Sequence, residues 1–216
     1  MNKMILYIAV LFSMGNANAG FIALDSTRGI GNQNFNGSLG MSFDVLSPIN
    51  VTHLGAFDSS QDGFSSQVSV GIFDRNTQAL VTEVALFNGT TAPLIGQSRF
   101  FDIADVQLGI GNYSIVAQGF NASNPNGNAG AVAPAPTINT GGLISFVGGG
   151  FYNFTSTLDY PLIVDFGPAN RYDAGTFQFE AVNNVPAPEA MWLLGSGLIG
   201  LFGMKKKTAK LSKKYA

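Results

Sequence analysis

The sequence predicts an all-β fold, an antiparallel β-sandwich with one helix at each end of the chain. Apolar and polar residues alternate along several short runs, and clusters of Gly, Asn and Asp separate these runs. Of the 216 residues, 46% are hydrophobic and only 11% are charged, which favours a packed core over exposed helices. Alternation with a period of two is typical of half-buried strands.

Each predicted strand places apolar residues on one side and ends in turn residues. The runs are 49–57 (Ile49, Val51, His53, Phe57), 67–74 (Val68, Val70, Ile72), 80–86 (Leu80, Val84, Leu86), 113–117 (Tyr113, Ile115, Ala117), 162–166 (Leu162, Val164, Phe166) and 177–179 (Phe177, Phe179). The turns are Asp62-Gly63, Asn88-Gly89, Gly109–Asn112, Gly167-Pro168 and Asp173–Gly175. Such short strands and turns favour a jelly-roll-like or immunoglobulin-like sandwich.

The segment 121–142 is rich in Asn, Gly, Ala and Pro and is predicted to form a long loop. It divides a first block, about 39–120, from a second, about 143–182. The second block has too few strands to build a core alone. Residues 20–182 are therefore expected to form one domain.

The N-terminus has the order of features of a secretory signal peptide over residues 1–19. Lys3 precedes the apolar run Met4–Met14, and Ala17-Asn18-Ala19 fits the small-residue rule for cleavage before Gly20. The alternative is an N-terminal core helix, in which the lysine and the cleavage pattern would have no role. We expect export, with Gly20 as the first mature residue.

The C-terminal segment 183–216 holds an apolar run and a basic tail. The run 190–204 has 15 residues, shorter than the roughly 20 of a full transmembrane helix. The lysine-rich tail 205–216 would stop translocation and stay cytoplasmic. The alternative is a soluble core helix with a solvated tail.

The charge distribution separates the body from this tail. Between Gly20 and Pro188 there are four Arg, no Lys, ten Asp and two Glu, a formal charge of −8. An acidic body without a basic patch argues against nucleic acid as a partner. The chain has no Cys, so disulfides, thiol catalysis and thiolate metal sites are excluded.

The C-terminal segment resembles a PEP-CTERM sorting signal, which is read by exosortase in Gram-negative bacteria. The Pro motif 185–190 carries Val185, Pro186 and Pro188. Ala187 stands where the name-giving motif has Glu, and Glu189 follows two places later, so a VPLPA-type signal is the alternative match. The remaining matching residues are Trp192, Leu193, Leu194, Gly195, Ser196, Gly197, Leu198, Gly200, Leu201, Lys205, Lys206 and Lys207.

The resemblance implies an exosortase-type processing enzyme as a partner. It also implies a precursor anchored in the inner membrane and a product at the cell surface or in the extracellular matrix, where polysaccharide is a further candidate partner. The first block is similar to a domain recurrent in such proteins, through Val51–Asp58, Asp62-Gly63, Val70–Asp74, Arg99–Ile103 and Gly111–Val116. That resemblance implies an extracellular sandwich.

Candidate catalytic and metal-binding residues are few. His53 is the only histidine and is expected to be a strand residue; a Ser-His-Asp triad would have to use it. Asp58 and Asp62 are a candidate calcium site, although their spacing also fits a hairpin turn. Asp102 with Asp105, or Asp159 with Asp165, are the carboxylate pairs that glycoside hydrolysis would need.

Aromatic residues give a further hypothesis. In Phe100-Phe101 and in Phe151–Phe154, neighbours on a strand face opposite ways, so one member of each is expected to be exposed. The candidates for stacking on sugar rings are Phe100, Phe101, Tyr152 and Phe154. The sequence thus favours a non-enzymatic exported protein without a cofactor. A carbohydrate-binding module is the alternative, and a glycoside hydrolase or other hydrolase is the third hypothesis.

Overall fold

The computed structural model describes residues 20–26, 28–129, 137–148 and 150–182. They belong to a compact unit that ends at Val182, and a second unit begins at Asn183. Within the described ranges no helix has the length and apolarity needed to cross a membrane. The predicted signal peptide and the whole C-terminal segment, including the apolar run 190–204, lie outside these ranges.

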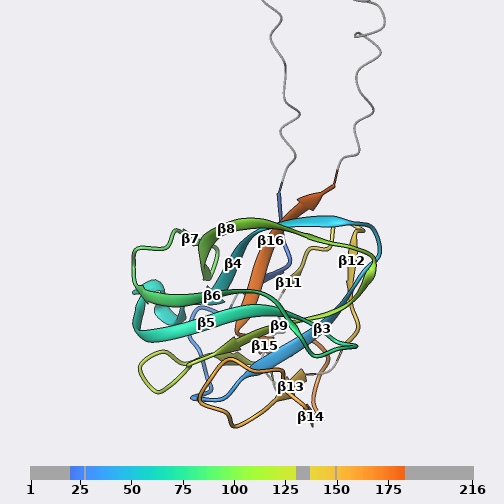
Figure 1. The fold of residues 1–216 in the computed structure, drawn as a ribbon. Helices are drawn as coiled ribbons and strands as arrows, with labels where there is room; N and C mark the ends of the chain where they lie inside the picture. Colours follow the sequence, from blue (N-terminus) through green and yellow to red (C-terminus); the bar gives the residue numbers. More distant parts are fainter. Residues whose placement is uncertain (1–19, 27, 130–136, 149, 183–216) are drawn as a thin grey trace, which may run out of the picture. The chain divides into compact units, whose positions relative to one another are not determined.

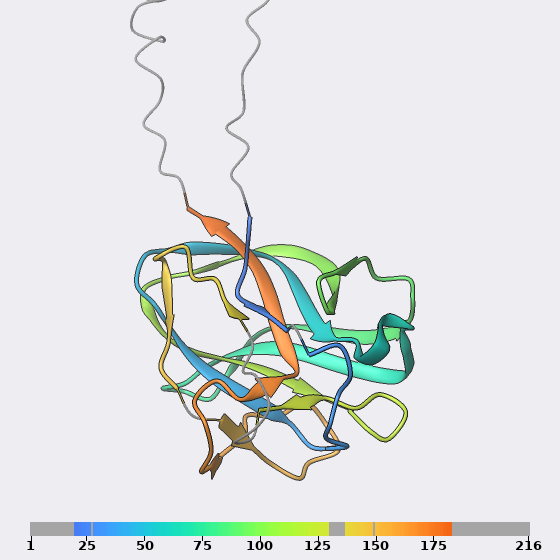
Figure 2. The ribbon, with the colours of Figure 1, turned by 180° about the vertical axis from the view of Figure 1, so that it is seen from behind.

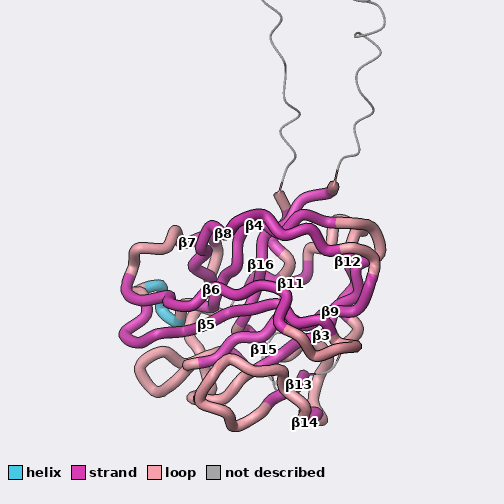
Figure 3. Tube along the Cα trace, in the orientation of Figure 1, coloured by secondary structure: helices cyan, strands magenta, loops and turns pink. Residues whose placement is uncertain are grey.

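The described domain is all-β, as the sequence predicts, and its strand pairs are antiparallel (Figures 1 and 3). One sheet has the order β1-β16-β4-β8-β7, formed by β1 (Phe21–Ile22), β16 (Gly175–Ala181), β4 (Ile49–Phe57), β8 (Ser98–Leu108) and β7 (Leu94–Ile95). The other has the order β14-β13-β3-β9-β5-β6, formed by β14 (Ile163–Asp165), β13 (Gly150–Tyr152), β3 (Leu39–Val45), β9 (Gly111–Gln118), β5 (Phe64–Asp74) and β6 (Leu80–Gly89), with β12 (Ile144–Phe146) also paired to β3.

Four short strands and one helical turn complete the described elements. Strand β2 (Leu24–Asp25) pairs with β11 (Thr137–Ile138), and β10 (Gly127–Asn128) pairs with β15 (Tyr172–Asp173). The 3-10 turn η1 (Ser59–Gln61) leads from β4 of one sheet to β5 of the other. The segment 121–142, predicted as a loop, thus contains two short strands in its described parts.

The core lies between the two sheets and is rich in phenylalanine. Phe43 of β3 packs against Phe177 of β16 with ring centroids 4.9 Å apart, which joins the sheets directly. Phe177 and Phe179 are fully buried on β16, and Val70 and Ile72 are fully buried on β5. Strand β16 runs beside β4 along its length (Figure 2). Val68, Val70 and Ile72 of β5 and Phe177 and Phe179 of β16 are buried as the period-two prediction expects, whereas in β4 and β9 consecutive residues are buried.

The prediction that His53 lies on the apolar side of its strand is wrong. The run 49–57 is one strand, but its register shifts between Val51 and His53 against β8. Against β16, Thr52 is an extra residue between the pairs Val51–Phe179 and His53–Gln178, and this β-bulge turns His53 off the apolar side, so that Leu54 faces the core instead. The His53 side chain is 34% exposed.

The apolar run 162–166 also differs from its expected burial. Strand β14 is the last strand of the larger sheet and pairs only with β13. Leu162, Val164 and Phe166 are therefore exposed, at 65%, 44% and 96%, and they do not contribute a core face.

A segment between β13 and β14 crosses the outer face of the larger sheet, and we call residues 153–161 the covering segment. Two glycines on that face leave room for it. A Cβ on Gly71 would lie 2.9 Å from Leu158 Cδ2, and one on Gly40 would lie 2.6 Å from Pro161 Cγ. The ring of Tyr160 meets the buried Phe73 edge-on, with centroids 6.0 Å apart.

Ser38, which is fully buried, fixes the covering segment to the start of β3. Its N–H donates to Asn153 Oδ1 at 3.1 Å, and the Asn153 N–H donates to the Ser38 carbonyl at 3.1 Å. Its hydroxyl donates to the Thr157 carbonyl at 3.3 Å and accepts from the Asp159 N–H at 3.1 Å. The covering segment is thereby held at three points along its length.

Candidate functional site

A cavity of about 180 Å³ beside β13 combines aromatic walls with polar side chains. We call it the aromatic pocket; it is lined by Gln33, Phe35, Leu39, Tyr152, Asp165 and Tyr172. At about 30 Å³ per water molecule, it has room for roughly six waters, or for one small ring-shaped ligand.

Phe35 and Tyr152 line one side of the pocket, and Phe154 packs against both of them without lining it. Phe35, Tyr152 and Phe154 contact one another pairwise, with ring centroids 5.4 to 5.7 Å apart. Phe154 is 76% exposed, whereas Tyr152 is half-buried. Of the residues predicted to stack on sugars, these two thus lie together, at the surface, beside a cavity.

The polar side of the pocket is pre-organised. The Tyr172 hydroxyl donates to Asp165 Oδ2 at 2.5 Å, and Arg171 Nη1 donates to Asp165 Oδ1 at 2.7 Å. Burial and the hydrogen bond to the Asp165 carboxylate raise the pKa of Tyr172 well above its usual range. Tyr172 therefore stays a neutral hydrogen-bond donor, and Asp165 is a fixed acceptor at the pocket wall.

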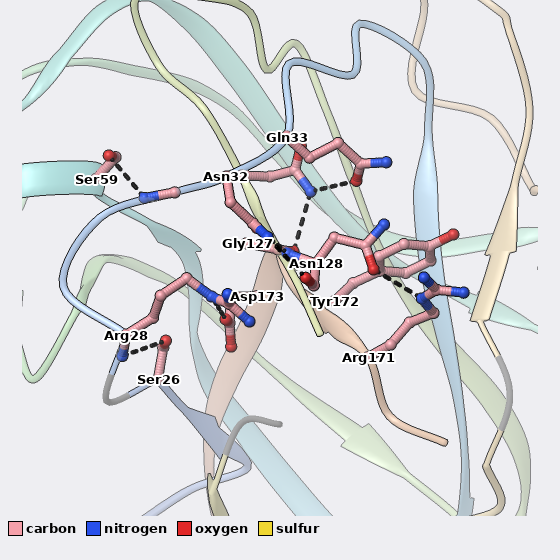
Figure 4. A network of polar contacts seen from close by, with 12 residues as sticks. Ser26, Arg28, Asn32, Gln33, Ser59, Gly127, Asn128, Arg171, Tyr172 and Asp173 are labelled. Carbon is pink, nitrogen blue, oxygen red and sulfur yellow. Dashed lines mark hydrogen bonds and ion pairs between the residues drawn. The ribbon is translucent and has the colours of Figure 1, made fainter. Parts of the chain in front are cut away.

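The remaining hydrogen bonds of the pocket reach into the segment after residue 120. Gln33 Oε1 accepts from Asn126 Nδ2 at 2.9 Å, which leaves the Gln33 amide N–H groups without a described partner. Asn128 of β10 accepts from Arg171 Nε at 2.7 Å and exchanges two hydrogen bonds with Asn32 (Figure 4). These bonds fix Arg171, which in turn holds Asp165.

A buried ion pair lies next to this network (Figure 4). Arg28 Nε is 2.6 Å from Asp173 Oδ2, and the two side chains are 7% and 1% exposed. Burial raises the pKa of Asp173, while the Arg28 guanidinium opposes that rise only in part. The pair ties the chain after β2 to β15, which carries Tyr172 to the pocket.

The other aromatic candidates lie elsewhere. Phe100 is 1% exposed, over Gly55 of β4, and Phe101 is half-buried and packs against the core. Together with Thr91, Ala92, Pro93 and Asp102 they line a separate cavity of about 250 Å³. Because Phe100 is covered, only Phe101 of this pair offers any ring surface to a ligand.

The two candidate calcium ligands lie in different environments. Asp58 is buried and accepts from Arg99 Nε at 2.6 Å and from the Gly63 N–H at 3.0 Å, whereas Asp62 is exposed. Arg99 also donates to the carbonyls of Gln61 and Ala92, at 3.0 and 2.9 Å. Asp58 thus serves an internal ion pair that holds the β4–β5 connection against β8.

The candidate catalytic residues do not assemble into a larger cluster. His53 Nδ1 lies 2.9 Å from Thr52 Oγ1, and its Nε2 lies 4.0 Å from Oδ1 of Asp102, which is 86% exposed. Asp105 accepts a hydrogen bond from Asn50 at the surface. Among the residues that the structure describes, no three His, Asp or Glu side chains gather as metal ligands would.

Comparison with protein-family models finds no match to this chain, and comparison with curated proteins finds none either. The sorting-signal residues Val185, Pro186, Pro188, Glu189 and Lys205–Lys207 lie outside the described ranges, as do Ala17 and Ala19. Gly20, the expected first mature residue, is described and exposed.

Sequence reasoning missed Gln33, Phe35 and Tyr172 as pocket residues. Phe35 lies in a polar run, Asn32–Ser38, whose composition indicates a loop. A single aromatic residue in such a run was the only sign of a binding role in the sequence. Its ring partner Tyr152 lies more than a hundred residues further along the chain, so only the tertiary fold shows that the two meet.

The Arg99–Asp58 pair gives a prediction about stability. Arg99→Met would leave the Asp58 carboxylate buried without a cation and is expected to lower the free energy of unfolding by about 3–5 kcal/mol. Arg75→Met, which removes a pair with Asp44 whose side chains are each 29% exposed, should cost about 0–1 kcal/mol. Urea unfolding of both variants measures this, and equal small losses would contradict the proposed role of Arg99.

Proposed function

We propose that this chain is an exported, non-enzymatic protein of the cell surface or the exopolysaccharide matrix. Its C-terminal segment holds the precursor at the inner membrane, where an exosortase-type enzyme reads and processes it. One observation carries the proposal: the order of Pro186 and Pro188, then 15 apolar residues, then Lys205–Lys207. Proline removes backbone donors and keeps the motif extended, in the form that a processing enzyme grips.

The position of the motif supports this reading. Strand β16 ends at Ala181, four residues before Val185, so the motif follows directly on the last described strand. Between Gly20 and Pro188 there is no lysine, and six of the seven lysines of the chain stand after the apolar run. Removal of the tail would therefore leave a strongly acidic body.

The proposal includes the finer features of the predicted architecture. These are a jelly-roll-like or immunoglobulin-like strand connectivity, a signal helix that is removed after Ala19, and a short membrane helix over 190–204.

Carbohydrate binding is the second candidate function, and the aromatic pocket favours it. Sugar rings present apolar C–H faces that stack on aromatic side chains, and hydroxyls that each donate and accept one or more hydrogen bonds. Tyr152 lines the pocket, and the exposed ring of Phe154 packs against it. The Gln33 amide and the Asp165 carboxylate offer a donor and an acceptor deeper inside.

The sorting proposal predicts the covalent form of the mature protein. In the native host it should begin Gly20-Phe21-Ile22-Ala23, end near residue 188 and lack all six tail lysines, as read by intact mass and N-terminal sequencing. Changing both Pro186 and Pro188 to Ala should leave the tail attached and the protein in the inner membrane. Pro168→Ala, in an exposed loop, is the matched control. Unchanged size and surface delivery of the double variant would refute the proposal.

The aromatic pocket predicts an effect on sugar binding. Phe154→Ala removes one exposed ring and should weaken the binding of a monosaccharide or disaccharide by about tenfold, the scale of one aromatic contact. Phe166→Ala removes a ring that is 96% exposed and does not line the pocket, so it should leave binding unchanged. Calorimetric titration against a sugar panel measures both, and equal losses in the two variants would count against the pocket.

A further inference from the structure

A second and larger cavity, of about 530 Å³, lies on the outer face of the larger sheet. Its floor carries Ser69 of β5, Glu83 of β6 and Gln118 of β9, and one wall is Ser156 and Thr157 of the covering segment. Ser69 pairs with Gln118 in register, and Glu83 pairs with Gly71, so these side chains share the outer face. We call this cavity the polar groove.

A side chain of the floor, Gln118, connects the two walls of the polar groove. Gln118 Nε2 donates to the carbonyls of Asn36 and Ser156, at 3.2 Å each, so one amide connects the two sides. The covering segment is itself held by Ser38 and by the gaps above Gly40 and Gly71. The groove is therefore set by the fold before any ligand arrives.

Several side chains that line the polar groove carry donors or acceptors that no described residue uses. The side chains of Asn36, Gln67, Ser69, Glu83, Ser156 and Thr157 make no hydrogen bond to another described residue. The Ser66 hydroxyl accepts from Asn121 Nδ2 and Asn124 Nδ2, at 2.7 Å each, so its own proton remains available to donate. These groups are amides and hydroxyls apart from a single carboxylate, Glu83.

We propose that the polar groove binds a segment of an uncharged polysaccharide. A chain of sugars presents donors and acceptors at every unit, which matches a surface of amides and hydroxyls. No cation for a phosphate or sulfate stands among the described residues that line the groove, and the formal charge of −8 over residues 20–188 repels polyanions. Leu158 is the one apolar side chain among these lining residues, so they do not form the series of apolar pockets with which proteins bind peptides.

This site is separate from the aromatic pocket and does not depend on the sorting proposal. No residue lines both cavities. Binding of the polysaccharide in the polar groove therefore requires neither processing at Pro186 nor a ligand in the aromatic pocket.

The experiment uses the full chain in a detergent without a sugar headgroup, such as an amine oxide. Affinity electrophoresis compares its retardation by dextran, galactomannan and mixed-linkage glucan with that by the polyanion polygalacturonate. We expect at least one uncharged polymer to retard the protein and polygalacturonate not to. The double variant Gln67→Ala, Ser69→Ala should weaken that binding by about tenfold, the scale of two ordinary hydrogen bonds.

Two further variants make the result specific. Glu83→Gln replaces the carboxylate by an uncharged amide of the same size and should bind within about twofold of the parent chain. Gln107→Ala alters an exposed residue of β8 and should bind like the parent. Circular dichroism shows that each variant is folded. Retardation by none of the uncharged polymers, a preference for polygalacturonate, or unchanged binding by the double variant would each overturn the proposal.

Discussion

Both candidate sites depend on a missing side chain. The covering segment, residues 153–161, lies against the larger sheet because Gly40 and Gly71 have no Cβ where Pro161 and Leu158 pack. Its first residues carry Phe154 beside the aromatic pocket, and Ser156 and Thr157 form a wall of the polar groove. One steric constraint on the sheet thus positions the segment that carries Phe154, which packs against the pocket residues Phe35 and Tyr152, and Ser156 and Thr157, which line the polar groove.

Charge is distributed so that the cations are used internally. Each of the four arginines in the body pairs with an aspartate: Arg28 with Asp173, Arg75 with Asp44, Arg99 with Asp58, and Arg171 with Asp165. Of the carboxylates that remain, Asp62, Asp102 and Asp159 are exposed and contribute to an acidic surface. Such a surface resists association with polyanions and still offers neutral polar sites to uncharged ligands.

The sequence predicted the fold class and the strand 49–57 because local alternation reflects burial directly. It could not place His53, since the bulge at Thr52 arises from pairing with β16, more than a hundred residues further along the chain. Leu162–Phe166 has the pattern of a core strand, but a strand face is buried only where another layer packs against it, and Ile163 and Val164, on opposite faces of β14, are both exposed. Asp58 was a candidate calcium ligand from its sequence context, and in the structure it pairs with Arg99, which only the tertiary fold brings near.

The most direct test concerns the steric constraint from which both sites follow. In Gly40→Ala the new Cβ would overlap Pro161, so amide hydrogen exchange along 153–161 should accelerate while the amides of β9 and β4 stay protected. Gly109→Ala, where a Cβ meets no atom within 4 Å, should exchange like the parent chain. Equal protection of the covering segment in all three proteins would show that its position does not depend on the bare backbone at Gly40, and would contradict the steric origin of both sites.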